Sequence, residues 1–183
     1  MQSLQGQLLI ATPELLDPNF AQSVLLILQH SEEGSLGLVL NHPLSVTVCQ
    51  AWQQVSELAC PFEGQLYRGG PCEGPLTAIH AEEFLLDIEV LPHVYASMRA
   101  DHLAQLILKA ESPLRFFAGT SGWAPGQLEA ELISGSWQTA PAKAELIFSH
   151  DEELWDNIRR ELAGNKVLSA LNIKHVPGDV SSN

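Results

Sequence analysis

Two apolar runs separated by a short polar loop are the feature that most constrains how this chain folds. The first run is SVLLILQ at 23–29, the loop HSEEGS follows at 30–35, and LGLVL occupies 36–40. If residues 31–34 form a four-residue turn, with Gly34 supplying the permissive backbone, the two runs pair as a β-hairpin. In this predicted register the facing pairs are His30 and Ser35, Leu28 and Gly37, Leu26 and Val39, and Val24 and Asn41.

Both faces of the predicted hairpin are apolar. One face would carry Val24, Leu26, Leu28, Gly37 and Val39, and the other would carry Leu25, Ile27, Leu36, Leu38 and Leu40. A strand pair that is apolar on both faces needs cover on both sides. Gly37 has no Cβ, which predicts the close approach of another backbone or side chain at that position. We therefore expect structure packed against each face of the hairpin.

Beyond the hairpin, strand patterns outnumber helix patterns. The strand candidates are GQLYRGGP at 64–71, GPLTAIHA at 74–81, FLLDIEVLPHVYASM at 84–98, PLRFFAGTSGW at 113–123, a segment around Trp137, and AELIFSH at 144–150. The helix candidates run from a Ser45 N-cap to about Leu58, from an Asp101 N-cap to about Ala110, from Pro125 to just before Gly135, and onward from a Ser149–Glu152 capping box. Three connections between strands are too short for helical crossovers, so antiparallel pairing should dominate. The predicted class is α+β.

Composition narrows the classes of function. The chain has 183 residues, 45% of them hydrophobic, which suits a single domain over residues 1–183 with a disordered tail from about residue 176. Nine Lys and Arg against 22 Asp and Glu give a net charge of -13, which repels phosphate backbones and anionic lipid and argues against direct nucleic-acid binding. The amino terminus has no basic region, and no apolar run reaches the roughly 18 residues of a membrane span. We therefore predict a soluble protein without membrane attachment.

The cysteines bear on the cellular compartment. Cys49, Cys60 and Cys72 are odd in number and lack C-x-x-C spacing. Such a set indicates neither a disulfide framework nor a zinc site. We therefore expect a cytoplasmic location, no bound metal and no cofactor.

Candidate ligand-binding residues gather where glycines, an aromatic side chain and short polar side chains occur together. They are Asp17, Asn19, Gly37, Asn41, Gly69, Gly70, Ser121, Gly122, Trp123 and Gln127. The glycine corners at 34–37, 69–71 and 119–126 would shape any cleft that these residues line. Whether the three corners share one cleft is not fixed by the sequence.

Most of these candidates also have a structural interpretation. Asp17 and Asn19 could order the turn before the first strand of the hairpin. Asn41 could bond backbone groups at a strand end instead of contacting a ligand. The RGGP corner at 68–71 could be an anion-binding backbone nest or a tight turn. For each of these sites the structural interpretation is favoured.

The GTSGW stretch at 119–123 does not match a catalytic motif. It fails the G-x-S-x-G pattern of a nucleophile elbow because Trp123 occupies the place of the last glycine. No spacing selects a histidine as the base for Ser121. Trp123 is more simply an aromatic anchor, with Gln127 and Glu131 one helical turn apart as a polar edge beside it. No catalytic residue is therefore assigned.

Four stretches together resemble the AlgH/YqgE family of bacterial proteins: GQLLIATPELLDPNFAQSVLLILQH, EEGSLGLVLNHP, YRGGP and GTSGWAPGQLEAELISGSW. The resemblance covers roughly residues 4–170. It implies an α+β fold in which a branched, mainly antiparallel sheet curls into a pseudo-barrel flanked by helices. Members are often labelled transcriptional regulators, and the resemblance carries over no catalytic residues. Where the family has a GYAGWGxGQLE pattern, this chain has Thr120, Ser121 and Ala124 instead.

Three functions remain open. The preferred one is a non-catalytic regulatory or adaptor protein that binds a protein partner or a small ligand, because no nucleophile, base and orienting group converge in the sequence. The second is a hydrolase-type enzyme with a polar site near Asp17, Asn41, Ser121 and Gln127. The third is a transcriptional regulator, as the family label suggests. Direct DNA binding would require a single basic patch formed by Arg68, Arg99, Arg115, Arg159 and Arg160.

Overall fold

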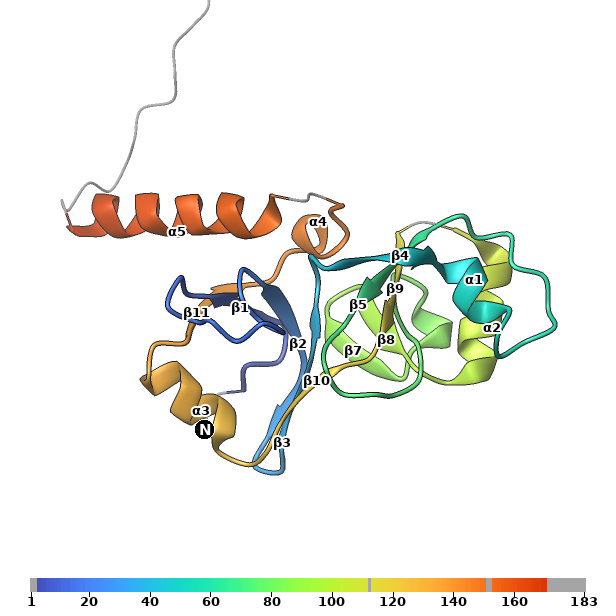
Figure 1. Cartoon of the computed structure of the whole chain (residues 1–183), viewed down its shortest axis with the longest axis horizontal. Helices are drawn as coiled ribbons and strands as arrows, with labels where there is room; N and C mark the ends of the chain where they lie inside the picture. Colours follow the sequence, from blue (N-terminus) through green and yellow to red (C-terminus); the bar gives the residue numbers. More distant parts are fainter. Residues whose placement is uncertain (1–2, 112, 151–152, 171–183) are drawn as a thin grey trace, which may run out of the picture.

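The computed structural model describes residues 3–111, 113–150 and 153–170. Their strands form two sheets (Figure 1). The first sheet has the order β10-β3-β2-β1-β11, with β1 at Gln7–Ala11, β2 at Val24–Ser31, β3 at Gly34–Val39, β10 at Ser121–Trp123 and β11 at Trp137–Pro141. The second has the order β4-β5-β9-β6-β8-β7, with β4 at Pro43–Thr47, β5 at Gln65–Arg68, β6 at Thr77–His80, β7 at Ile88–Leu91, β8 at Val94–Ser97 and β9 at Leu114–Ala118.

Antiparallel pairing dominates both sheets, as predicted. Of the strand pairs within the described residues, β5 with β9 is the parallel one. The helices are α1 at Val48–Trp52, a 3-10 turn at Glu83–Leu85, α2 at Ala100–Lys109, α3 at Gln127–Ile133, α4 at Ala144–Ile147 and α5 at Leu154–Ala170. The α+β class is therefore confirmed. The predicted curled sheet takes the form of two sheets, and neither closes into a barrel over the described residues.

The inner sides of the two sheets meet, α3 covers the outer side of the first sheet, and α1 and α2 cover that of the second (Figure 1). Residues of α4 and α5 pack into the central cluster. The central cluster lies between the sheets and includes Leu8, Ile10, Leu26 and Leu38 from the first and Ile79, Val94 and Phe117 from the second. On the outer side of the first sheet, Leu9, Leu25, Ile27 and Val39 pack with Leu128 of α3. On the outer side of the second, Ala78 and Phe116 pack with Leu103, Leu106 and Ile107 of α2. Both faces of the hairpin are therefore covered, as predicted.

The hairpin forms, but its register differs from the prediction beyond the turn. His30 faces Ser35 as expected, and Ser31 pairs with Gly34, so the turn has two central residues. A bulge between Ile27 and Gln29 then shifts the pairing by one residue. The pairs predicted for Gly37 and Val39 are wrong, because Gly37 faces Ile27 and Val39 faces Leu25.

The close approach predicted at Gly37 is confirmed. A Cβ at this position would lie 2.9 Å from the carbonyl oxygen of Leu26 and 3.3 Å from Cζ3 of Trp123. The bulge turns Val39 toward the α3 side, where it joins Leu25 and Ile27 instead of Leu26. The face assignments of β2 therefore hold, and those of β3 are exchanged.

Several predicted element boundaries are wrong for local reasons. Ser45 lies inside β4, and α1 starts at Val48 because Thr47 and Gln50 form a reciprocal capping box. This helix ends at Trp52, well before Leu58. Residues 144–147, predicted as a strand, form α4.

The start of α2 differs from the prediction, and the end of α3 agrees with it. The N-cap of α2 is Arg99, and Asp101 lies in the first turn, where its carboxylate bonds the Arg99 guanidinium instead of the helix backbone. The α3 helix ends before Gly135, as predicted. Glu152 of the predicted capping box and the tail from residue 176 lie outside the described residues.

The cysteine prediction is wrong in one respect. Cys49 on α1 and Cys60 form a disulfide with a Cα–Cα distance of 5.4 Å, whereas Cys72 is free and exposed. The pair closes a loop of irregular structure after α1, and its spacing of 11 residues matches no motif that sequence reasoning uses. Within the described residues, no helix has the length and apolar character needed to cross a membrane.

Candidate functional site

The three glycine corners pack against one another. Because β10 pairs with β3, Ser121 lies opposite Gly37. A Cβ at Gly69 would lie 2.3 Å from the carbonyl oxygen of Gly119. Glycine is thus required where two backbones come into direct contact. The corners share a packed junction, and one cavity takes part of its wall from two of them, at Gly34, Ser35, Leu36 and Trp123.

Ser121 belongs to this junction. It has 0% exposure, and its hydroxyl donates a 3.1 Å hydrogen bond to the carbonyl oxygen of Gly69. A nucleophile needs access to its substrate and a base within hydrogen-bond reach. The contact of Ser121 instead ties β10 to the corner that follows β5.

The other short polar candidates also bond the backbone. The Asp17 carboxylate accepts a hydrogen bond from the amide of Asn19 at 2.8 Å. The side chain of Asn41 accepts one from the Val24 amide and donates one to the Gln22 carbonyl oxygen, both at 2.9 Å. These contacts agree with the structural interpretation of both sites. Of the four residues in the hydrolase hypothesis, Asn41 lines the cavity described below.

Trp123 is anchored by a carboxylate on α3. Its indole Nε1 donates to Glu131 Oε2 at 2.9 Å, and Trp137 donates to the same oxygen at 2.8 Å. Gln127 Nε2 donates to the other carboxylate oxygen at 2.9 Å, and its own Oε1 accepts from the Ala124 amide. The predicted aromatic anchor with a polar edge is therefore present in the structure.

Replacing Glu131 tests this anchor. We expect Glu131→Ala to lower the free energy of unfolding by about 1.5 kcal/mol, because two largely buried indole N–H groups lose their acceptor. Glu131→Gln keeps an acceptor oxygen and should cost about half as much. Urea unfolding followed by tryptophan fluorescence measures both. Equal stability of the alanine variant and the wild type would show that water replaces the carboxylate.

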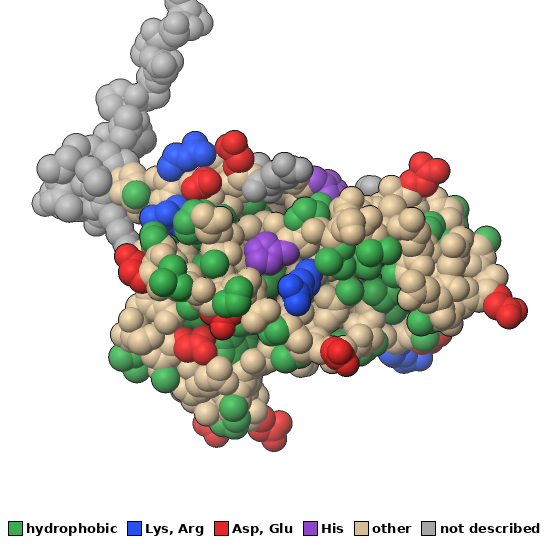
Figure 2. All heavy atoms as spheres, in the orientation of Figure 1, with side chains coloured by type: hydrophobic (Ala, Val, Ile, Leu, Met, Phe, Trp, Pro, Cys, Tyr) green, Lys and Arg blue, Asp and Glu red, His purple; other side chains and the backbone are tan. Residues whose placement is uncertain are grey.

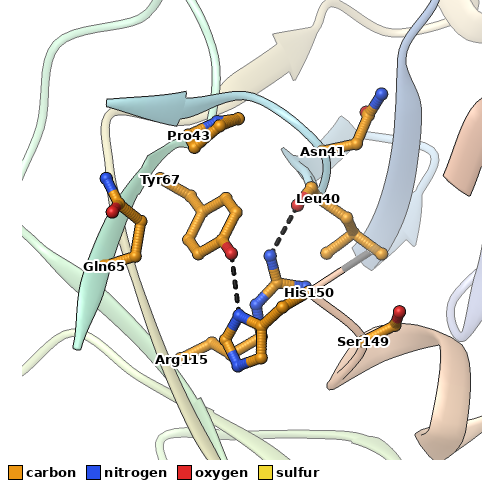
Figure 3. Close-up of a pocket in the computed structure, with 8 residues that line it drawn as sticks. All are labelled: Leu40, Asn41, Pro43, Gln65, Tyr67, Arg115, Ser149 and His150. Carbon is orange, nitrogen blue, oxygen red and sulfur yellow. Dashed lines mark hydrogen bonds between the residues drawn. The ribbon is translucent and has the colours of Figure 1, made fainter. Parts of the chain in front are cut away.

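A cavity of about 250 Å³ opens at one edge of the two sheets (Figure 3). We call it the inter-sheet cavity. Its walls come from the end of the hairpin, from β4, β5 and β9, and from the segment between α4 and α5. The lining residues are Leu40, Asn41, Pro43, Gln65, Tyr67, Arg115, Ser149 and His150. A ligand in this cavity would contact the end of the hairpin, the second sheet and the segment between α4 and α5 at once.

Arg115 is the buried charge at this cavity, with 2% exposure. Its guanidinium donates to the carbonyl oxygens of Leu40 and Ile147, each at 2.6 Å, and lies 4.0 Å from the centroid of the Tyr67 ring. These bonds join β9 to the end of the hairpin and to α4. Arg115 Nε has no hydrogen-bond partner, and no carboxylate of the described residues forms an ion pair with the guanidinium. Burial lowers the pKa of Arg115, and Tyr67 partly opposes this.

Tyr67 and His150 complete the polar wall. The Tyr67 hydroxyl lies 2.8 Å from His150 Nδ1, and Figure 3 shows the two side chains directed toward each other beside Arg115. Burial and the charge of Arg115 lower the pKa of His150 from its ordinary value. His150 is therefore neutral at physiological pH, and Arg115 carries the positive charge of this wall.

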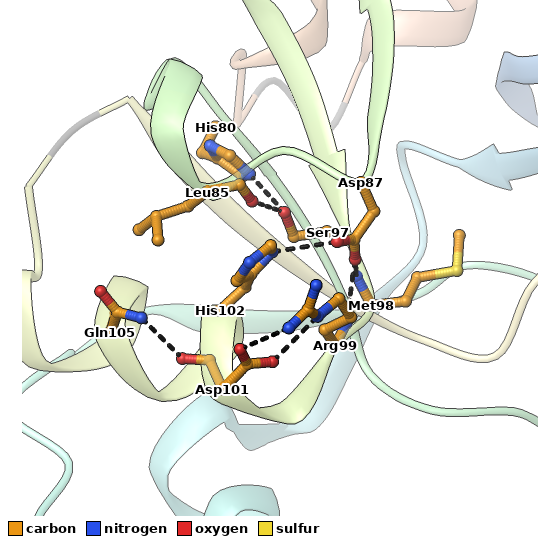
Figure 4. Close-up of polar contacts among 9 residues, drawn as sticks. All are labelled: His80, Leu85, Asp87, Ser97, Met98, Arg99, Asp101, His102 and Gln105. Carbon is orange, nitrogen blue, oxygen red and sulfur yellow. Dashed lines mark hydrogen bonds and ion pairs between the residues drawn. The ribbon is translucent and has the colours of Figure 1, made fainter.

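A second polar cluster lies under α2 (Figure 4). The Glu82 amide donates to His80 Nδ1 at 3.1 Å, so the proton of the neutral ring is on Nε2, which lies 2.9 Å from Ser97 Oγ. The Ser97 hydroxyl in turn donates to the Leu85 carbonyl oxygen. His80 and Ser97 are 1% and 0% exposed, which removes them from contact with a substrate.

Asp87 extends this cluster toward the start of α2. Its Oδ2 accepts hydrogen bonds from the amides of Met98 and Arg99, at 2.6 and 3.0 Å. Its Oδ1 lies 2.9 Å from His102 Nδ1, which is an ion-pair distance without hydrogen-bond geometry. The cluster therefore fixes the entry into α2.

The arginines named for a DNA-binding patch have separate surroundings. Arg115 is buried, Arg99 pairs with Asp101 at 2.8 Å, and Arg160 lies 3.6 Å from Glu153. Figure 2 shows Lys and Arg side chains scattered over the face in view, with Asp and Glu among them. Direct nucleic-acid binding gains no support from this arrangement, and its absence stays a prediction.

Sequence reasoning did not select Tyr67, Arg115 or His150 as ligand-binding residues. The sequence names Arg115 only as part of a possible basic patch, and it does not single out His150. The usable signal is the position of Arg115 in LRFFA, where an arginine interrupts an apolar strand. An arginine in such a strand must be buried with compensating contacts.

Comparison with known proteins identifies a matching family and similar sequences. A family model described as AlgH-like matches residues 8–167. A UPF0301 protein of Chlorobaculum tepidum is 39% identical over 181 residues, covering 94% of each chain, and one of Myxococcus xanthus is 39% identical over 165 residues, covering 87% of this chain and 91% of the relative.

Solved structures agree with these matches. The solution structure of AlgH from Pseudomonas aeruginosa has a TM-score of 0.74 and 29% identity, covering 96% of each chain. The crystal structure of a protein from Corynebacterium diphtheriae has a TM-score of 0.70 and 25% identity, covering 88% of this chain and 87% of that one. The sequence resemblance is thereby confirmed, and the chain belongs to the AlgH-like family.

Proposed function

We propose that this chain is a non-catalytic regulatory protein that binds a small ligand in the inter-sheet cavity. The observation that carries the proposal is the origin of the cavity walls, which come from the hairpin, from β5 and β9, and from the segment before α5. A ligand that contacts several elements can shift the equilibrium between their arrangements. Such a shift is what a regulatory or adaptor protein needs in order to change its affinity for a partner.

The hydrolase alternative has less support. Ser121 has no accessible surface, and Asn41 and Asp17 bond the backbone. The Tyr67 and His150 pair at the cavity could move a proton, and the Ser149 hydroxyl lines the same cavity, but an orienting carboxylate beside the pair is not found among the described residues. The binding function therefore fits the contacts better than a catalytic one.

A ligand screen tests the proposal. Small metabolite-like molecules are screened by ligand-observed NMR, and hits are located through the ring signals of Tyr67 and His150. We expect a hit to slow amide hydrogen exchange at the end of β3 and in α4 together, because both contribute carbonyl groups to Arg115. The hit should be recovered chemically unchanged. Steady turnover of the hit, lost on a single polar substitution in the cavity, would assign an enzyme instead.

Matched variants locate the site. Gln65 is exposed and lines the cavity, so Gln65→Trp should block the cavity with little effect on folding and weaken the hit at least 10-fold. Gln105 is an exposed residue of α2, and Gln105→Trp should leave the affinity within 2-fold. Equal binding by both variants would place the ligand elsewhere.

A further inference from the structure

We propose that the ligand of the inter-sheet cavity is a small oxyanion, a carboxylate or a phosphate group, whose charge is neutralised by Arg115. The inference rests on the proposed function, because it names the chemical class that the same cavity accepts. It is carried by the charge, the hydrogen-bonding groups and the size of the cavity.

Among the described residues, the positive charge of Arg115 has no carboxylate partner. Arg115 is 2% exposed, yet the described carboxylates that form ion pairs are all bonded to other residues. A buried cation is ordinarily paired or bound to an anion, because its desolvation is costly. Carbonyl oxygens and the Tyr67 ring compensate part of this cost, but they carry no net charge. An anion in the adjoining cavity would supply the missing charge.

The hydrogen-bonding groups also suit an oxyanion. A guanidinium has five N–H donors, and the two carbonyl contacts of Arg115 leave others for a ligand. Arg115 Nε is buried and without a partner. Planar guanidinium groups bind carboxylate and phosphate oxygens with matched geometry. A cation in the same place would meet the Arg115 charge and is therefore disfavoured.

The size of the cavity limits the ligand to a small molecule. Its volume is about 250 Å³, and typical drug-sized ligands occupy pockets of roughly 300–1,000 Å³. Leu40 and Pro43 supply apolar wall, while Tyr67 offers both an aromatic face and a hydroxyl. A carboxylate or phosphate on a short apolar body fits these walls.

Isosteric probes test the assignment. Wild-type protein is titrated with inorganic phosphate, benzoate and benzamide at constant ionic strength, and binding is read from the NMR shifts of the Tyr67 and His150 rings. Benzoate and benzamide have nearly the same shape and differ in charge. We expect benzoate to bind at least 10-fold more tightly than benzamide, and phosphate to shift the same ring signals.

Two arginine variants provide the matched comparison. Arg115→Met removes the charge but keeps a long side chain, and replacing a buried charge by an apolar group of similar volume is often tolerated. It should abolish the preference for benzoate. Arg99 is exposed and paired with Asp101, so Arg99→Met should keep the full preference. If Arg115→Met does not fold, the wild-type comparison of benzoate with benzamide still decides the question.

The outcomes separate this inference from the proposed function. If benzamide binds the cavity as tightly as benzoate, the oxyanion assignment is wrong and a cavity for a neutral ligand remains. If anions bind but shift signals outside the cavity, Arg115 is not their partner and the inference fails. If the probes leave the Tyr67 and His150 signals unchanged and the wider screen also gives no cavity hit, both proposals fail.

Discussion

Gly69→Ala is expected to lower the free energy of unfolding by about 3 kcal/mol. The added Cβ would lie 2.3 Å from the carbonyl oxygen of Gly119 and 2.6 Å from Cδ2 of Leu38. The first contact is with backbone, which cannot rotate away. The clash of the added methyl group can therefore be relieved only if the backbones at the junction between the glycine corners move apart.

Gly74→Ala is the matched control. It adds the same methyl group a few residues later, and nothing lies within 4 Å of the added Cβ. Its free energy of unfolding should stay within about 0.5 kcal/mol of the wild type. Urea unfolding followed by circular dichroism and tryptophan fluorescence measures both variants. Equal stability of the two would mean that the corners do not pack as the structure has them.

The packed junction explains why glycine corners were a good guide to the fold and a poor guide to the site. Gly37 was predicted from its missing Cβ to meet another group, and Trp123 fills that place. The same reasoning could not tell a cleft from a packed contact, since both require glycine. Here the small residues allow close contact, and the Ser121 hydroxyl stabilises this contact through its hydrogen bond to the Gly69 carbonyl oxygen.

Local patterns identified the strands of the hairpin but not its bulge. The turn near Gly34 and the pair His30 with Ser35 follow from local sequence. The register shift between Ile27 and Gln29 does not follow from local sequence. Both faces of the hairpin are apolar, so the hydrophobic pattern favours neither register. Because a one-residue slip exchanges faces, Val39 was placed on the wrong side.

The inter-sheet cavity could not be assembled from spacing alone. Tyr67, Arg115 and His150 are separated by 48 and 35 positions, and only Arg115 stands out in its own segment. Their meeting depends on the parallel pairing of β5 with β9 and on the position of α4. The Cys49–Cys60 disulfide was missed for a related reason, since only the folded loop brings the two sulfur atoms together.

Acidification should destabilise the protein through His80. The pKa of His80 is lowered from 6.5 to about 4, mainly because burial disfavours the charged ring, while the nearby charges of Glu82 and Asp87 partly oppose this shift. In the unfolded chain this histidine titrates near its ordinary pKa, so the unfolded state binds more protons between these two values. The stabilising contribution of His80 is therefore complete above about pH 6.5 and is lost as the pH falls toward 4.

We expect this contribution to be about 2 kcal/mol, after a reduction for solvent screening. His80→Gln can reproduce both hydrogen bonds of the neutral ring, with Oε1 as acceptor and Nε2 as donor, but it does not titrate. The variant should be less stable than the wild type at pH 7.5 and should lose less stability between pH 6.5 and 5, as measured by urea unfolding. His42 and His150 also have lowered pKa values, so part of the acid sensitivity must remain in the variant.

The control is His93→Gln, which changes an exposed histidine at the β7–β8 turn. It should keep the pH dependence of the wild type. If the unfolding free energies of His80→Gln and His93→Gln depended on pH in the same way, the ring of His80 would have to be hydrated in solution. Water would then reach the hydrogen bonds that link Glu82, His80, Ser97 and Leu85. If the unfolding free energy depends less on pH in His80→Gln alone, the acid sensitivity comes from the neutral His80 ring, which holds the loop before β7 in place.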